Sequence, residues 1–415
     1  MSNSVPRRIR YAAIVTRAGD MPAFHVPIII FYGVQYLNLS VATAILLFYG
    51  VGAFSNVCEI PAGAFADRYG RRLSYFLGIG LLVSGYGLWL FQLPILALAG
   101  ARLVAAVGDS LVSGTVDAMV YEEHHRRDEL ENYRKFKSHA SRAFHGFRLV
   151  GMPIGALLFA IKPQLALVAS IGSLLVCALA CMFIPDNNVV PKEHTTISLM
   201  KSTISRAFAN YNVRLLLITT FVMGFLGELF WRSFQPAYEE LGLEVKYIGM
   251  FYAAFSFISF AITFFIQRIS KTRQIYYLLI GGMLLTVVSL GSASVFPIIA
   301  VIALTQAANS IFFIMLEVPV PVYVQNQYER YQQSTILSVM SMTLMGGLAI
   351  AEIFEGGMLY FMTVRQTYIV MTAIAVIATL ILAPALWKCA RSFDPNETIE
   401  GDVVPPPIVS VPAQL

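Results

Sequence analysis

The sequence predicts an all-α membrane protein whose twelve transmembrane helices form two six-helix bundles, with both termini in the cytoplasm. Hydrophobic residues make up 57% of the 415 positions and charged residues only 13%, whereas soluble domains carry about 25% charged residues. Mean hydropathy is +0.68. Apolar runs of about 20 residues, the length that crosses a bilayer core of about 30 Å, recur along the whole chain. Most of the surface is therefore expected not to face water.

Six apolar runs fill the first half of the chain, and each predicts one transmembrane helix. They are Met21–Leu37, Val41–Phe65, Ser74–Leu93, Pro94–Tyr121, Gly146–Ile161 and Gln164–Ile184. The first run follows a basic stretch and ends without the small-residue cleavage site of a signal peptide. We therefore expect it to be a retained first helix.

Six further runs follow a polar segment, Pro185–Arg214, which predicts a cytoplasmic linker. These runs are Leu215–Tyr238, Ile248–Ile266, Ile275–Val295, Pro297–Val324, Ser334–Met362 and Thr367–Leu386. The tail from Ser392 has no apolar periodicity and is predicted to be disordered. The expected organisation is a bundle at 1–184, a linker at 185–214, a second bundle at 215–391 and a cytoplasmic tail at 392–415.

The basic residues are distributed unevenly between the two faces that these helices define. Twenty-three of the 29 lysines and arginines fall on one face, three fall inside helices, and the other face has only Lys162, Lys246 and Arg365. The positive-inside rule places the basic face and both termini in the cytoplasm, which predicts a multi-pass protein of the inner (plasma) membrane. Because the basic residues lie in loops and form no basic helix face, we expect no nucleic-acid partner.

The loop between the second and third predicted helices carries the string Gly63-Ala64-Phe65-Ala66-Asp67-Arg68-Tyr69-Gly70-Arg71-Arg72. It resembles the G-x-x-x-D-R-x-G-R-R signature of the major facilitator superfamily. That resemblance covers nearly the whole chain and implies a fold of two bundles related by a pseudo-two-fold axis, with a site between them near the midplane. It also implies a gating motif, which we assign to Glu59, Gly63, Asp67, Arg68, Gly70, Arg71 and Arg72. The alternative is a basic loop that only sets topology.

Ionisable residues interrupt the fourth predicted helix. Arg102, Asp109 and Asp117 are spaced so that they lie within about 60° of one another on a continuous helix. Ionisable groups at bilayer depth cost several kcal/mol unless they pair or line a wet cavity, so these three mark a candidate path for protons or substrate. The alternatives are a structural Arg102–Asp109 salt bridge, and a role for Asp117 in an inner gate.

The second half has its own intramembrane charges. Glu228 and Arg232 lie four residues apart in the seventh helix, a spacing that permits an ion pair. Glu317 lies in the tenth helix, and in the eleventh Glu352 and Glu355 are three apart, where two carboxylates raise one another's proton affinity. We expect these residues to bind protons or line the substrate path, and the alternative for the glutamates is structural hydrogen bonding.

In the fifth helix, Gly151, Pro153 and Gly155 resemble the glycine and proline motif of proton-coupled drug antiporters, although the paired glycines of that motif are absent. The alternative is close packing of helices with a proline kink. Five aromatic residues are candidates for a stacking surface, or for interfacial and lipid-facing positions: Phe230, Trp231, Phe234, Tyr238 and Tyr252.

No phosphate-binding loop, HExxH motif, nucleophile elbow or paired-cysteine metal site occurs in the sequence. We therefore expect neither an enzyme nor a metal or cofactor. The resemblance implies a monomeric, proton-coupled exporter of a small amphipathic drug or metabolite, whose partners are its substrate, protons and the lipid bilayer. The alternatives are uptake of a nutrient or iron-chelate by proton symport, and a membrane sensor or scaffold that does not transport.

Overall fold

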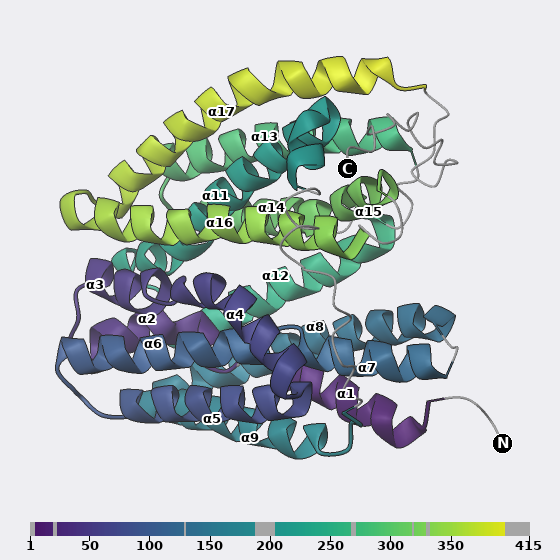
Figure 1. The fold of residues 1–415 in the computed structure, drawn as a ribbon. Coiled ribbons are helices and arrows are strands. Elements are labelled where there is room, and N and C mark those ends of the chain that lie inside the picture. The colour runs from purple at the N-terminus through teal and green to yellow at the C-terminus, as the bar shows by residue number, and fades with distance from the viewer. Residues whose placement is uncertain are drawn as a thin grey trace, which may run out of the picture.

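The computed structural model describes residues 5–19, 23–127, 130–186, 204–266, 271–317, 319–328 and 333–394, and all secondary-structure elements in these ranges are helices. Within these ranges, eight helices are long and apolar enough to cross a membrane, and three shorter apolar helices accompany them. Figure 1 shows two bundles, α1–α9 below and α11–α17 above. The fold is that of an all-α membrane protein.

The first predicted helix is interrupted. An amphipathic helix, α1 (Arg7–Gly19), precedes a 3-10 turn, η1 (Val26–Ile28), a single α-turn, α2 (Ile29–Phe31), and a π-helical turn, η2 (Tyr32–Tyr36). Pro27 lies in the 3-10 turn and has no amide hydrogen to donate to a helical bond. The expected helix Met21–Leu37 is therefore corrected to a shorter apolar helix, Val26–Tyr36, that begins with a 3-10 turn and ends with a π-helical turn.

The rest of the first bundle contains two further interruptions. The second span consists of α3 (Val41–Ile45), the π-helical turn η3 (Leu46–Gly50) and α4 (Phe54–Tyr69). After α5 (Arg71–Trp89), the fourth span is divided into α6 (Ile95–Val112) and α7 (Thr115–Arg126). Gly114 at this break has φ +70°, a conformation that glycine adopts at low cost and that ends a helix. The bundle ends with α8 (Leu130–Ile161) and α9 (Pro163–Cys181).

The second bundle contains longer helices. They are α11 (Tyr211–Glu240), α12 (Val245–Ile266), α13 (Thr272–Val295), α14 (Ile299–Glu317), α15 (Pro319–Asn326), α16 (Gln333–Phe361) and α17 (Val364–Ser392). The predicted tenth helix corresponds to α14 and α15, between which residue 318 lies outside the described residues. Most of the predicted linker, 187–203, and the tail from 395 onward lie outside the described residues.

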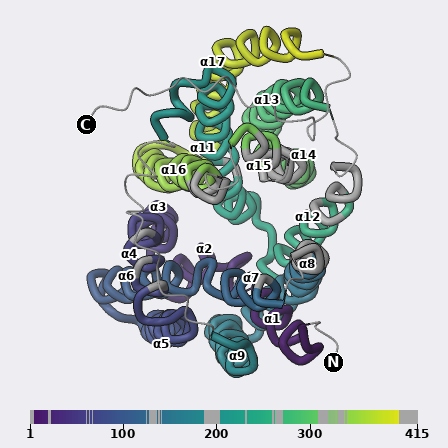
Figure 2. The backbone as a smooth tube through the Cα atoms, turned by 45° about the vertical axis from the view of Figure 1, so that its right-hand side comes forward, coloured from purple at the N-terminus to yellow at the C-terminus, as the bar shows by residue number. Residues whose placement is uncertain are grey.

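The bundles meet along two lines. In Figure 2, α8 of the first bundle lies beside α12 of the second, and α3 and α4 lie near α16. Within the bundles α5 packs on α6, α11 on α16 and α13 on α17. Large apolar side chains such as Leu96, Leu304 and Leu380 are exposed on the outside of the bundles, as expected for a surface that faces lipid.

The beginning of α1 and the end of α17 lie at the same end of the molecule (Figure 1). We call this the inner end because it carries the basic face of the sequence. The opposite, outer end carries the connections α2–α3, α5–α6 and α16–α17. Toward the outer end the bundles are in contact, and toward the inner end their ribbons diverge (Figure 1).

Candidate functional site

Arg102 and Asp109 of α6 form an ion pair within the fourth span. Arg102 Nη1 donates to Asp109 Oδ2 at 3.1 Å. The Arg102 side chain is 14% exposed and that of Asp109 is 37% exposed. The carboxylate is therefore accessible at a depth where α6 is otherwise apolar, whereas the guanidinium is enclosed.

The same guanidinium contacts the second span of the first bundle. Arg102 Nε donates to the carbonyl oxygen of Phe48 in η3 at 2.8 Å. Arg102 therefore joins a carboxylate on its own helix to the main chain of a neighbouring one.

A buried cluster of aromatic side chains extends from Phe48, whose ring contacts that of Trp89, to Tyr86 and His25. His25 Nδ1 lies 2.9 Å from Ser170 Oγ, and the His25 ring contacts the edge of Tyr86 with a centroid separation of 4.8 Å. Because the Ser170 hydroxyl donates to the Ala166 carbonyl at 3.1 Å, His25 Nδ1 is the donor in its bond to Ser170. His25 thus links the first span to α9.

Asp117 is separated from the Arg102–Asp109 pair. It lies in α7, beyond the break at Gly114, and forms an ion pair with Arg17 of α1, with Nε and Oδ1 3.3 Å apart. The expectation that Arg102, Asp109 and Asp117 share one helix face was wrong, because it assumed a continuous helix through position 114. Glu59 of α4 reaches this break, where its carboxylate hydrogen-bonds to Ser113.

The arginines of the sequence motif are held at the inner end of the first bundle. Gly70, with φ +107°, makes the turn between α4 and α5. Arg71 forms an ion pair with Glu122 of α7. The Arg72 amide donates to Asp186 at 3.1 Å, and its side chain donates to the Ile184 carbonyl just after α9. The loop thus fastens α5 to α7 and to the segment that follows α9.

Other residues of the motif make few contacts in this arrangement. Arg68 lies over the Tyr69 ring, 5.3 Å from its centroid. A β-carbon at Gly63 would meet no atom of the described residues within 4 Å, so none of them packs closely against this glycine. Asp67 belongs to α4, but its side chain lies outside the described residues.

Three acids of the second bundle are buried on two helices that pack together. Glu228 lies on α11, and Glu352 and Glu355 lie on α16; all three are buried, Glu355 completely. Tyr368 of α17, which hydrogen-bonds to Ser233, lies within electrostatic reach of Glu355. The acids therefore occupy the interior of the bundle rather than its lipid-facing surface. The side chains of Arg232 and Glu317 lie outside the described residues.

The small residues of α8 lie where that helix approaches the turn before η1 and the helix α12. A β-carbon at Gly151 would lie 3.0 Å from the Ala23 Cβ, and one at Gly155 would lie 2.5 Å from the carbonyl carbon of Phe24. From the second bundle, a β-carbon at Gly249 of α12 would lie 2.5 Å from the Met152 carbonyl oxygen and 2.7 Å from Pro153 Cα. Gly151, Pro153 and Gly155 are thus positioned for close backbone packing.

Gln235 of α11 connects the bundles through hydrogen bonds that the sequence analysis did not anticipate. Its Oε1 accepts from the Ile30 amide at 3.2 Å, and its Nε2 donates to the Val26 carbonyl at 3.3 Å. Nε2 also donates to the Tyr252 hydroxyl at 2.6 Å. Tyr252 belongs to the predicted aromatic group, and its ring centroid lies 5.0 Å from that of Phe234; the side chain of Phe230 lies outside the described residues. The available signal was a lone amide among the aromatic residues of the seventh predicted helix.

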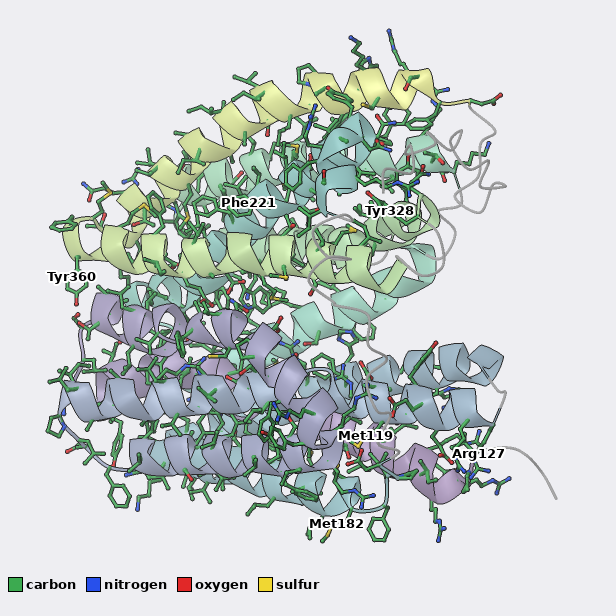
Figure 3. All side chains as sticks on the ribbon, viewed as in Figure 1. Met119, Arg127, Met182, Phe221, Tyr328 and Tyr360 are labelled. Carbon is green, nitrogen blue, oxygen red and sulfur yellow. The ribbon has the colours of Figure 1, made fainter. Side chains whose placement is uncertain are left out.

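A second connection between the bundles lies nearer the outer end. Thr43 Oγ1 and the Tyr360 hydroxyl are 2.9 Å apart, and in Figure 3 the Tyr360 side chain leaves α16 toward the first bundle. One turn along each helix, a β-carbon at Gly356 would lie 2.5 Å from Leu46 Cγ. We call these four residues, Thr43, Leu46, Gly356 and Tyr360, the outer interface. Arg127, labelled in the same figure, lies at the inner end.

The arrangement places ionisable side chains inside both bundles and closes the gap between the bundles toward the outer end. Among the described residues, no group of three His, Cys, Asp or Glu side chains is placed to hold a metal ion. Acids at this depth can exchange protons, and an interface between two bundles can open and close.

Comparison with protein families gives one model, described as Major Facilitator Superfamily, which matches residues 21–352. An uncharacterized MFS-type transporter of Bacillus subtilis (strain 168), YxaM, is 21% identical over 226 residues, which cover 52% of this chain and 55% of that protein. The match thus spans about half the length of this curated relative.

Solved structures of similar shape include three transporters. An auto-inhibited peptide transporter of the POT family has a TM-score of 0.73 at 12% identity, covering 94% of this chain and 98% of its own. A bacterial homologue of the lysosomal transporter Spinster, in an inward-facing and unoccupied conformation, has a TM-score of 0.69 at 14% identity, covering 94% and 100%. The nucleoside transporter NupG gives 0.67 at 12% identity, covering 93% and 99%. At these identities the likeness concerns the fold alone.

Proposed function

The chain belongs to the major facilitator superfamily, a superfamily of membrane transporters, and on that premise we propose that it is a secondary transporter of a small amphipathic molecule. It works by alternating access, in which the two bundles rock about a site between them. Its location is the cytoplasmic (inner) membrane, with both termini inside, and it acts as a monomer.

The proposed driving force is the proton gradient. The observation that carries this proposal is the Arg102–Asp109 pair, an accessible carboxylate held at membrane depth by an enclosed arginine. An ionisable group in a membrane is costly and is retained where it serves a path for protons or solute. Glu228, Glu352 and Glu355, buried inside the second bundle, are the other proposed proton carriers.

Export is the proposed direction, and the aromatic group around Gln235 supports an amphipathic substrate. Trp231 contacts Tyr252 with ring centroids 5.5 Å apart, and Tyr238 packs on Phe234 at 5.6 Å. Aromatic faces attract flat apolar molecules and organic cations. Uptake by proton symport is the second candidate, and the likeness to a nucleoside transporter and a peptide transporter suggests which substrates to test.

The arrangement corresponds to a state that is closed toward the outside. The bundles touch through the outer interface and through Gln235, and they diverge toward the inner end (Figure 1). The inward-facing conformation described for the Spinster homologue is consistent with this assignment.

The test uses purified protein in liposomes with an imposed pH gradient. Three probes represent the candidate substrates: ethidium as an aromatic cation, uridine as a nucleoside, and dialanine as a peptide. We expect gradient-driven movement of at least one probe, with its direction distinguishing export from uptake. Asp109→Asn and Glu228→Gln should each abolish that movement while the protein still inserts, because neither amide binds a proton at neutral pH.

Glu244→Gln serves as the matched control, since Glu244 lies in the connection between α11 and α12 and pairs with Lys246 outside the bundles. It should transport normally. Full transport by both Asp109→Asn and Glu228→Gln would contradict the proton-coupling assignments. Absence of movement for all three probes in either direction would contradict the proposed substrate classes.

A further inference from the structure

The π-helical turn of the second span leaves one main-chain carbonyl in surplus. The Val51 amide donates to the Leu46 carbonyl at 2.8 Å, five residues back, whereas the Ala53 amide donates to the Tyr49 carbonyl at 2.8 Å, four residues back. Between these two bonds there are two carbonyl acceptors, those of Leu47 and Phe48, and only one main-chain donor, the Gly52 amide. One of the two carbonyls must find its donor elsewhere.

Arg102 supplies that donor through its bond to the Phe48 carbonyl. A buried carbonyl without a donor is costly, and inside a membrane protein no bulk water replaces it. A π-helical turn is itself uncommon and occurs mostly at functional sites. The turn and the arginine therefore depend on one another. The η3 turn leaves the Phe48 carbonyl without a main-chain donor, and Arg102 supplies the missing hydrogen bond.

Gly52 provides the space in which this bond forms. A β-carbon at position 52 would lie 2.7 Å from the Arg102 Cζ and 2.6 Å from the Phe48 carbonyl oxygen, and it would also contact Nη2. These separations are shorter than real β-carbons adopt, so any side chain at position 52 displaces the guanidinium, the carbonyl or both. The bond between Arg102 and the Phe48 carbonyl therefore requires glycine at position 52.

The turn that Arg102 supports is also the part of the first bundle that contacts the second. Leu46 begins η3 and packs against Gly356 of α16, and Gly50 at the end of the turn approaches Ile353, with a β-carbon distance of 3.9 Å. Thr43, one turn earlier, reaches Tyr360. A change in the position of Arg102 is therefore transmitted to the outer interface through at most one helical turn.

We propose that Gly52 is a positioning residue, which lets Arg102 join Asp109 of α6 to the surplus carbonyl of η3 and thereby stabilises the closed outer interface. Asp109 holds the guanidinium from one side, and His25 and Tyr86 lie within electrostatic reach of it. The inference rests on the proposed function in one respect, namely that opening of the outer interface is part of the transport cycle.

The experiment measures closure of the outer interface without any substrate. Cys58, Cys177, Cys181 and Cys389 are free cysteines and are first replaced by serine. Leu46→Cys and Gly356→Cys are then introduced, and the rate at which the pair forms a disulfide under mild oxidant is followed in membranes. Their β-carbons lie within about 4 Å in the closed arrangement, which is within the range for a disulfide.

Gly52→Ala should slow disulfide formation at least fivefold, roughly the smallest effect typical of coupled sites. Gly100→Ala is the matched control, because a β-carbon on that α6 glycine meets no atom of the described residues within 4 Å, and it should leave the rate unchanged. Arg102→Ala should slow the reaction as Gly52→Ala does. In the Arg102→Ala background, Gly52→Ala should add little, because the group it displaces is gone.

Two outcomes overturn the inference. One is an unchanged rate for Gly52→Ala in protein that reaches the membrane in normal amounts. The other is an equal effect of Gly52→Ala with and without Arg102, which would make position 52 a packing site only. Should Gly52→Ala fail to fold, Arg102→Lys decides, since a single ammonium cannot serve the carboxylate and the carbonyl as a planar fork does: a slower rate supports the inference and an unchanged rate overturns it.

This test is separable from that of the proposed function. Disulfide formation requires neither a solute nor a pH gradient. Loss of coupling between positions 52 and 102 therefore contradicts the inference even if Asp109→Asn abolishes transport. Full transport by Asp109→Asn and Glu228→Gln contradicts the proton-coupling proposal even if the coupling is present.

Discussion

At the scale of single residues, Gln235 takes the place of a helical hydrogen bond in the other bundle. In a continuous α-helix the Ile30 amide donates to the carbonyl of Val26, four residues earlier. Here the carboxamide of Gln235 lies between them and bonds to both, at 3.2 Å and 3.3 Å. One side chain thus bonds to two backbone groups at the start of this helical segment, one in the 3-10 turn and one in α2.

Replacement of Gln235 by leucine keeps the volume but leaves these two backbone groups and the Tyr252 hydroxyl without this partner. Each buried polar group that loses its bond costs about 1–3 kcal/mol. We expect Gln235→Leu to lower the melting temperature of the detergent-solubilised protein clearly. Gln327→Leu is the control, because Gln327 is exposed after α15, and equal melting temperatures for the two variants would contradict this role of Gln235.

At the scale of the helices, the outer interface depends on one glycine of α16. Gly356 faces the Leu46 side chain, whereas a β-carbon at the adjacent Gly357 meets no atom of the described residues within 4 Å. Adjacent residues point about 100° apart on a helix, so only one of the two glycines faces the first bundle. Alanine at Gly356 or Gly357 changes helix propensity in the same way. A difference between the two variants therefore reports contact between the bundles.

Gly356→Ala is expected to weaken the closed arrangement by overpacking against Leu46, at a cost of about 1–3 kcal/mol. The reporter is Thr43→Cys as the only cysteine, labelled with an impermeant thiol reagent. Leu46 is kept, because a cysteine at that position would remove the side chain that the added β-carbon meets. Labelling of the reporter from outside should increase for Gly356→Ala and stay unchanged for Gly357→Ala. Equal labelling of the two variants would show that Gly356 does not hold the interface.

At the scale of the whole molecule, the sequence was sufficient for the architecture because each span carries its own signal. Runs of about 20 apolar residues and the separation of basic loops require no knowledge of neighbouring helices. The motif at Gly63–Arg72 identified the family because its glycines and charges are local in sequence. The interior position of Glu228, Glu352 and Glu355 likewise follows from the cost of exposing acids to lipid.

Interruptions of the helices were not predictable in the same way. The break at Gly114 removed Asp117 from the face that holds Arg102 and Asp109. A helical wheel cannot show this, because it assumes that the helix is continuous. The π-helical turn at Leu46–Gly50 depends on Arg102, which is 54 residues away from its partner Phe48. The Gln235–Ile30 bond spans 205 residues. Contacts of this kind exist only once the two bundles are assembled.

The central claim is that transport requires the outer interface to open. The most direct test is transport by the Leu46→Cys/Gly356→Cys protein, free of other cysteines, before and after oxidation, with the probe that the unmodified protein moves. We predict that the disulfide stops movement of the probe and that a reducing agent restores it, while each single-cysteine protein is unaffected by oxidant. Undiminished transport by fully cross-linked protein would contradict the claim.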